Sequence, residues 1–111
     1  MPGTRLFVYG TLMDAARLRT LTGHAFPHQP ATLTGFVRIA PPGGYPYVVP
    51  RAGGRVEGLL LEEVDPASLG ALDAYEDEGR LYRRTAVEVQ VGSRRVGCDV
   101  YVGKPARPPG A

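Results

Sequence analysis

The sequence predicts an α+β fold, with a strongly curved sheet or small β-barrel and two short helices. About six short runs have the composition of β-strands, at residues 5–9, 31–39, 47–49, 56–64, 85–91 and 95–102. Two segments, residues 14–21 and 65–76, have helical composition. Glycines stand inside three of the strands, at Gly35, Gly58 and Gly97, where bends or bulges would curve a sheet.

The N-terminal part contains one predicted strand and one predicted helix. Residues 5–9 are a short β-type run that ends at Gly10. Residues 14–21 contain two leucines three positions apart, and Gly23 is a stop signal for the helix.

The middle of the chain predicts strands separated by a loop. Residues 31–39 alternate partly between apolar and polar, as a strand does. Residues 41–46 read Pro-Pro-Gly-Gly-Tyr-Pro and predict an irregular loop. Residues 47–49 predict a brief strand bounded by Pro50, and residues 56–64 form the most apolar strand candidate.

The second helix carries the most informative residue of the chain, Glu76. Asp65 suits the N-cap, Pro66 the first helical position, and Gly79 a stop soon after the helix. Leucines at positions 69 and 72 set an apolar stripe, and position 76 lies only about 20° from position 69 around the axis. A carboxylate is therefore aimed at the face that should be buried.

Two interpretations of Glu76 stay open on periodicity alone. A buried carboxylate responds with a raised pKa, which makes Glu76 a candidate general base. The acidic neighbours Asp73, Asp77 and Glu78 and the helix C-terminus would act in the same direction. Alternatively, Glu76 is an ordinary acidic helix end that fraying turns toward solvent.

The C-terminal part predicts a hairpin and a tail. Residues 85–91 and 95–102 predict strands, and residues 91–94, Val-Gly-Ser-Arg, predict their connection. We expect a single domain over residues 1–103, followed by an extended or flexible Pro-rich tail over residues 104–111.

Composition limits the classes of function. The net charge of +2 comes from 13 basic and 11 acidic residues spread along the chain, which is too balanced for a nucleic-acid-binding protein. No apolar run reaches the roughly 20 residues that span a bilayer, and the N-terminus lacks a signal-peptide pattern. We therefore expect a cytoplasmic protein without a membrane partner.

Metal binding is not expected either. The single cysteine, Cys98, excludes a multi-cysteine zinc site, and its strand-like surroundings predict a small buried side chain. His24 and His28 are four residues apart, but Pro27 stands between them and disfavours a shared helix face.

The turn after the first strand is the second informative segment. Gly10 permits a tight backbone path, so that successive N–H groups of Gly10, Thr11 and Leu12 could converge on an anion. A helix beginning near Asp14 would add positive potential at its N-terminus. The pattern alone is weak, because most strand-Gly-Thr turns bind nothing.

Several segments together resemble the γ-glutamylcyclotransferase-like (AIG2-like) family, with the small γ-glutamylamine cyclotransferase branch as the closest likeness. They are Phe-Val-Tyr-Gly-Thr-Leu at 7–12, Gly-Tyr-Pro at 44–46, Val-Glu-Gly at 56–58, Leu-Asp-Ala-Tyr-Glu at 72–76 and Leu-Tyr-Arg-Arg-Thr at 81–85. The resemblance runs in order from about residue 5 to 102. It implies a small mixed-strand barrel with short helices, and the reaction of that family, which needs no cofactor or metal.

The resemblance also implies roles for residues. Glu76 would be the catalytic acid and base. Four residues would form the loop that binds the γ-glutamyl group: Tyr9, Gly10, Thr11 and Leu12. Tyr82 matches a tyrosine near the family's pocket, and Arg84 matches the arginine of the Tyr-x-Arg motif.

Other side chains keep two interpretations. Tyr45, Tyr82 and Tyr101 could line the pocket, although Tyr45 and Tyr101 are equally well read as half-exposed aromatics. Arg84 binds a substrate carboxylate or forms a structural ion pair with the acidic cluster.

The chain departs from the family pattern after Glu76. Relatives commonly have glycine directly after the catalytic glutamate, whereas this chain has Asp77, Glu78 and then Gly79. After Leu12 the chain continues with Met13 and Asp14 rather than the basic residues of many relatives. The identity of the leaving group therefore stays open.

The implied reaction is intramolecular. The α-amine of a γ-glutamyl group attacks its own γ-carbonyl, which forms 5-oxoproline and releases an amine or amino acid. The alternatives are a binding module that holds a γ-glutamyl or other carboxylate ligand without turnover, and a purely structural domain. The sequence leaves the oligomeric state open.

Overall fold

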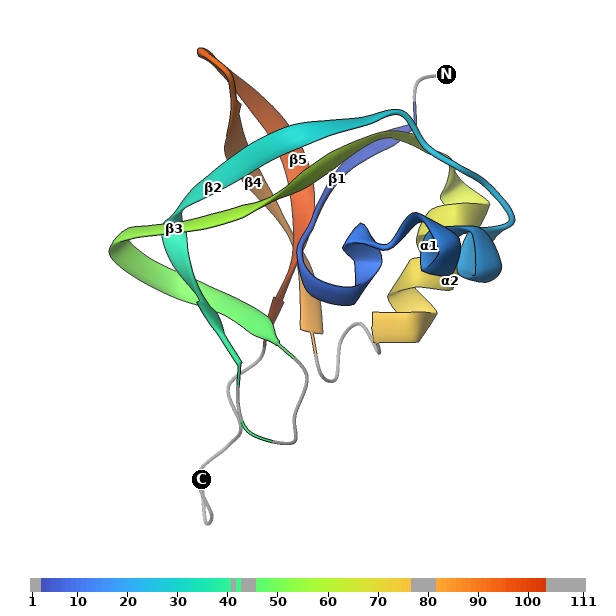
Figure 1. Ribbon diagram of the computed structural model, residues 1–111, viewed down its shortest axis with the longest axis horizontal. Coiled ribbons are helices and arrows are strands. Elements are labelled where there is room, and N and C mark those ends of the chain that lie inside the picture. The colour runs from blue at the N-terminus through green and yellow to red at the C-terminus, as the bar shows by residue number, and fades with distance from the viewer. Residues whose placement is uncertain (1–2, 41, 43–45, 77–81, 104–111) are drawn as a thin grey trace.

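The structure is a computed structural model that describes residues 3–40, 42, 46–76 and 82–103. Five strands form a closed barrel in the order β1-β3-β2-β4-β5 (Figure 1). The strands are β1 (Thr4–Val8), β2 (His28–Ile39), β3 (Tyr47–Val64), β4 (Tyr82–Val91) and β5 (Arg94–Gly103). The helices are the 3-10 helix η1 (Gly10–Met13), α1 (Ala15–Thr22) and α2 (Pro66–Glu76).

Strand directions in the barrel are mixed, because β1 and β5 are parallel whereas the other neighbouring pairs are antiparallel. The expected α+β class and small barrel are thus confirmed. The hairpin between the last two strands is also confirmed, since Val91 pairs with Arg94 across the turn.

The expected break at Pro50 is wrong. Residues 47–49 and 56–64 belong to one strand, β3, in which Pro50 pairs with Phe36 of β2. Proline has no N–H for a ladder and is tolerated where one side of a strand has no strand partner. The described pairs of β3 with β1 lie only between Leu59 and Val64, so the other side of β3 is a free edge at Pro50.

The three strand glycines have different roles. Gly35 has φ +82°, and the β2–β3 register shifts between Thr34 and Phe36, so the expected bulge is confirmed there. Gly58 and Gly97 lie in regular register and form no bulge. Gly58 instead permits close approach of β1, because a Cβ atom there would lie 2.3 Å from the Val8 carbonyl oxygen.

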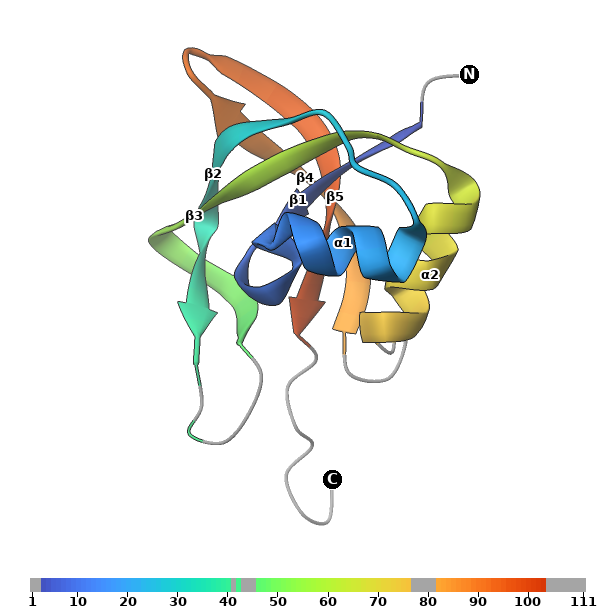
Figure 2. The ribbon, with the colours of Figure 1, turned by 45° about the vertical axis from the view of Figure 1, so that its right-hand side comes forward.

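Both helices begin as their capping residues dictate, and α1 also ends at its expected glycine. The Asp14 side chain accepts a hydrogen bond from the Ala16 N–H (2.9 Å), and Gly23 ends α1 with φ +77°. The Asp65 carboxylate accepts from the Ser68 N–H at 3.1 Å, and Pro66 is the first residue of α2. The expected end signal at Gly79 lies outside the described residues. Figure 2 shows α1 and α2 side by side against the barrel.

The apolar side chains form two clusters. One fills the barrel and includes Phe7, Leu33, Val48, Leu60 and Val100. The other joins the helices to the outside of the barrel and includes Leu6, Leu12, Leu18, Leu69, Leu72 and Tyr101. Because β1 sends alternate side chains to the two clusters, its end lies where barrel and helices meet.

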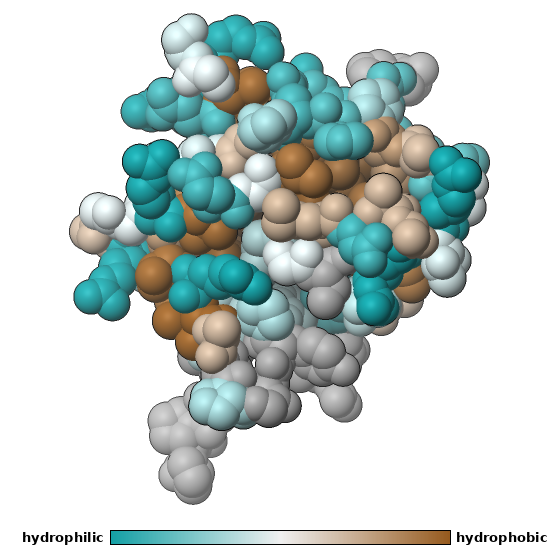
Figure 3. Space-filling view, in the orientation of Figure 1, coloured by the Kyte–Doolittle hydropathy of each residue, from teal (hydrophilic) through white to brown (hydrophobic). Residues whose placement is uncertain are grey.

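Polar residues cover much of the face seen in Figure 3, where hydrophobic residues appear as separate areas between hydrophilic ones. Among the helices of the described part, none combines the length and apolar character needed to cross a membrane. Cys98 is buried as expected, and burial raises the pKa of its thiol to about 12.

Candidate active site

Glu76 lies at the end of α2 on its buried face. Leu69 and Leu72 of the same stripe are 8% and 0% exposed, and the Glu76 side chain is partly buried. Glu76 lines a pocket of about 230 Å³, open mouth included, with Phe7, Val8, Tyr9, Leu12 and Tyr101. The buried orientation expected from periodicity is therefore present, and the alternative of an ordinary exposed helix end does not hold.

Burial raises the pKa of the Glu76 carboxyl from its ordinary 4.5 to about 7. The contribution expected from Asp77 and Glu78 stays a prediction, and among the described residues burial is the cause of the rise. Asp73 is paired with Arg84, and residues 77 and 78 lie outside the described part of the chain. A group with this pKa exchanges protons readily near neutral pH.

Two tyrosines of the pocket are connected to each other. The Tyr9 hydroxyl donates to the backbone carbonyl of Tyr101, and the Tyr101 hydroxyl donates to Oδ1 of Asp73 at 2.6 Å. Burial is the largest cause that raises the pKa of both hydroxyls, and the nearby Glu76 charge adds to the rise. Both side chains therefore stay protonated at neutral pH.

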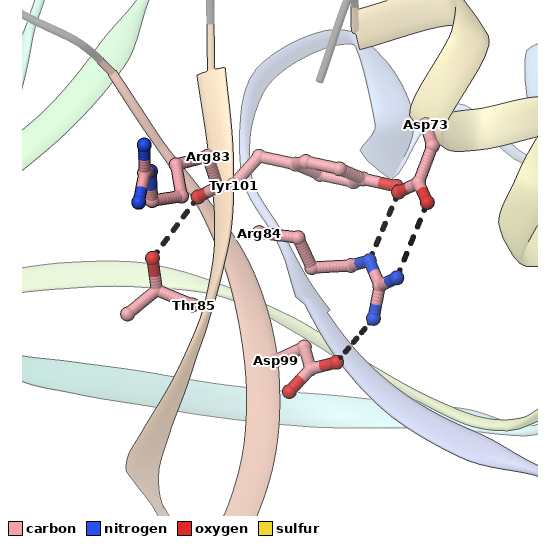
Figure 4. A network of polar contacts seen from close by, with 6 residues as sticks. All are labelled: Asp73, Arg83, Arg84, Thr85, Asp99 and Tyr101. Atoms are coloured by element: carbon pink, nitrogen blue, oxygen red, sulfur yellow. Dashed lines mark hydrogen bonds and ion pairs between the residues drawn. The ribbon is translucent and has the colours of Figure 1, made fainter. Parts of the chain in front are cut away.

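Arg84 holds this arrangement from β4 (Figure 4). Its guanidinium donates to both carboxylate oxygens of Asp73, at 2.9 and 3.2 Å, and to Asp99 of β5 at 2.8 Å. These bonds raise the Arg84 pKa. Of the two interpretations of Arg84, the structural ion pair is present, and binding of a substrate carboxylate by Arg84 stays a prediction.

The turn after β1 folds as the 3-10 helix η1, which the sequence did not predict. Gly10 has φ +75°, and Leu12 is 2% exposed and lines the pocket. Thr11 lies between them in η1. The first N–H groups of a helical turn have no acceptor within the helix. Anion binding by this turn stays a prediction.

Tyr82 is not among the described residues that line the Glu76 pocket, although it packs in the same apolar cluster as Leu12 and Tyr101. Tyr82 is 8% exposed, and its hydroxyl donates to the Pro46 carbonyl at 2.9 Å, so its observed contact is structural. Tyr45 lies outside the described residues. Asp73 was missed as a site residue, although its position one turn before Glu76 was a signal that both share a helix face.

Within the described residues, no group of three or more His, Cys, Asp or Glu side chains is arranged to hold a metal ion. What the pocket does offer is one carboxyl group of raised pKa and two protonated tyrosines. Such groups can exchange a proton and donate hydrogen bonds.

Comparisons with known proteins identify relatives of this chain. Residues 6–110 match the family model described as gamma-glutamyl cyclotransferase, AIG2-like. AIG2-like protein C of Arabidopsis thaliana is 34% identical over 102 residues, which cover 89% of this chain. This chain spans only 58% of that relative's length.

Solved structures have the same fold. A solution structure of an Arabidopsis thaliana protein superimposes with a TM-score of 0.85 at 29% identity and covers 97% of this chain and 72% of that one. A structure named gamma-glutamyl cyclotransferase has a TM-score of 0.78 and covers 94% and 68%. At 18% identity, the second likeness concerns the fold alone.

Proposed function

The chain belongs to the gamma-glutamyl cyclotransferase, AIG2-like family, and we propose that it cyclises a γ-glutamyl group to 5-oxoproline with Glu76 as general base and acid. The observation that carries this proposal is the Glu76 carboxyl in the pocket beside Tyr9 and Leu12, with a pKa of about 7. The molecule released is an amine or amino acid.

Glu76 would handle the proton that moves during the reaction. The substrate α-amine is mostly protonated at neutral pH, so the ionised Glu76 first takes one proton from it. The free amine then attacks the γ-carbonyl and forms the ring C–N bond. Glu76 returns this proton to the leaving nitrogen as the original C–N bond breaks, and the second proton that the ring nitrogen loses ends on the released amine. No proton is gained or lost overall.

The pocket would mainly position the substrate. Because nucleophile and carbonyl belong to one molecule, correct orientation is worth roughly 7–11 kcal/mol relative to a bimolecular reaction. Tyr9 and the N–H groups of Gly10, Thr11 and Leu12 are the proposed contacts of the γ-glutamyl group, either at its α-carboxylate or at the developing oxyanion. Arg84 would act indirectly, by fixing Asp73 and Tyr101.

The first test replaces Glu76 by glutamine, which keeps the shape and removes the proton acceptor. We expect 5-oxoproline formation from a panel of γ-glutamyl amines and dipeptides, measured by mass spectrometry, to fall by about 10²–10⁴-fold. Glu88→Gln is the matched control, because Glu88 is exposed on β4 and is expected to leave activity unchanged.

The outcomes separate the candidate functions. A Glu76→Gln enzyme with full activity would exclude Glu76 as the base. Ligand binding without any product across the panel would favour the alternative of a binding module with the same fold. Neither binding nor product would leave a structural domain as the remaining candidate.

A further inference from the structure

The bulge in β2 determines where Arg38 points. Strict alternation from the buried Leu33 would place Val37 inside the barrel and Arg38 outside. The extra residue at Gly35 shifts the alternation by one, so that Phe36 and Arg38 share the inner face. The register confirms this, because Arg38 pairs with Val48, which is 0% exposed in the barrel core, and paired residues share a face.

Arg38 lies next to the site on this inner face. The backbone of its partner Val48 lies near Tyr9 and opposes the rise of the Tyr9 pKa. The positive charge of Arg38 also opposes the rise of the Tyr9 pKa. Thus the guanidinium acts on a tyrosine that lines the pocket with Glu76.

The β2–β3 arm that carries Arg38 forms a rim of the site. Pro46 accepts the Tyr82 hydrogen bond, and its Cγ would lie 3.2 Å from a Cβ at Gly10. The Tyr47 ring lies against Gly103 at the end of β5. The beginning of β3 therefore contacts the turn after β1 and the end of β5, from which Tyr9 and Tyr101 enter the pocket.

Arg38 is available for a ligand. Four described arginines form ion pairs with carboxylates: Arg5, Arg55, Arg84 and Arg95. Arg38 is exposed, and among the residues that the structure describes no carboxylate forms a salt bridge with it. A guanidinium in this state is suited to a planar, two-oxygen anion such as a carboxylate.

We propose that Arg38 binds a carboxylate on the leaving group, so that the preferred substrates are γ-glutamyl amino acids or peptides rather than γ-glutamyl amines. This inference rests on the proposed cyclotransferase function. The pocket around Glu76 is small, so part of a γ-glutamyl substrate would extend beyond it. In this proposal the γ-glutamyl group lies at the pocket, and the leaving group extends to the rim where Arg38 stands.

The test compares two substrates that differ only in that carboxylate, γ-glutamyl-alanine and γ-glutamyl-alaninamide. We expect the wild-type kcat/KM to favour γ-glutamyl-alanine by about 5–10-fold at low salt, and less at 0.5 M salt because Arg38 is exposed. Arg38→Ala should remove the preference by slowing only the carboxylate substrate. Arg51→Ala, which removes an exposed arginine elsewhere on β3, should keep the preference.

Three results would overturn the inference while the enzyme remains active. The first is that wild type shows no preference for γ-glutamyl-alanine, and the second is that the preference survives in Arg38→Ala. The third is that Arg38→Ala slows both substrates equally, which would place Arg38 on the α-carboxylate that both substrates contain.

Calorimetric binding in the Glu76→Gln background makes the test independent of turnover. Tighter binding of γ-glutamyl-alanine that Arg38→Ala abolishes supports the inference even if wild type yields no 5-oxoproline and the cyclotransferase proposal fails. Equal binding of the two ligands, or binding of neither, overturns the inference.

Discussion

At the residue scale, one carboxyl group combines a cost to folding with a proposed chemical use. Glu76 occupies a stripe position where leucine would be expected, between the helix and the tyrosines of the pocket. Burial raises its pKa to about 7, close to the pH at which a proton acceptor works best. The neighbouring carboxylate, Asp73, is also partly buried but differs because it is paired with Arg84. The two environments separate a structural carboxylate from the one that we propose takes part in the reaction.

The raised pKa of Glu76 predicts the pH dependence of the reaction. The base must be ionised, so log kcat/KM should rise with a slope of about one below pH 7 and level off above it. Steady-state assays with a γ-glutamyl dipeptide from pH 5 to 8 measure this limb. A limb centred near 4.5, the ordinary value of a glutamate, would contradict the assignment.

At the element scale, the site depends on how closely β1 approaches β3. Val8 pairs with Leu59, and a Cβ atom added at Gly58 would lie only 2.3 Å from the Val8 carbonyl oxygen. The Phe7 ring is 2.7 Å from the same position. Only glycine fits between these backbone and ring atoms. The position of the end of β1, and with it the positions of Tyr9 and η1, therefore depends on the absence of a side chain at residue 58.

We expect Gly58→Ala to destabilise the fold by about 1–3 kcal/mol and to lower activity, because β1 and the turn after it must shift. Gly97→Ala is the matched control, since a Cβ at Gly97 would meet no atom within 4 Å and its φ is not positive. This variant should be neutral or slightly more stable. Urea denaturation of both variants measures the difference, and equal stabilities would contradict the packing argument.

At the scale of the whole molecule, the barrel brings segments far apart in the chain to one end. β1 leads into η1, α2 ends at Glu76, and β5 ends beside Tyr101. Each segment is held by different neighbours: β1 by β3 and β5, and α2 by α1 and the shared apolar cluster. The pocket is a property of the closed barrel and the helices together.

The free energy of unfolding of the whole domain should respond to the state of Glu76. The folded-state pKa is raised, so stability is highest below about pH 4.5, decreases up to about pH 7 and then levels off. The shift corresponds to at most about 3 kcal/mol, and partial exposure reduces this to about 1–2 kcal/mol. Glu76→Gln, which does not titrate, should gain that much relative to wild type between pH 4 and pH 8.

Urea denaturation of wild type, Glu76→Gln and the exposed control Glu88→Gln at both pH values measures this change. The control accounts for the loss of one negative charge. A stability difference between wild type and Glu76→Gln that is the same at pH 4 and pH 8 would contradict the burial of the carboxyl group.

Local signals in the sequence predicted most of the elements. Asp14 and Asp65 cap the helices, and Gly23 ends α1, because a cap depends on hydrogen bonds to neighbouring residues. The bulge at Gly35 was predicted from a glycine inside a strand, but the same signal at Gly58 and Gly97 marks no bulge. The break predicted at Pro50 was wrong, and the helix η1 was not predicted. Both features depend on which parts of the chain lie next to these segments in space.

The sequence by itself determined which face of α2 carries Glu76, because the helical period relates positions 69, 72 and 76 without reference to the rest of the chain. Tertiary structure alone decided what that carboxyl group meets. It brought Tyr101 to the pocket, joined Asp73 to Arg84, and placed Arg38 beside Tyr9. Barrel closure sets these contacts between residues 11 to 92 positions apart. Strand pairing specifies such neighbours, and the pairing of distant strands cannot be predicted from a local sequence pattern.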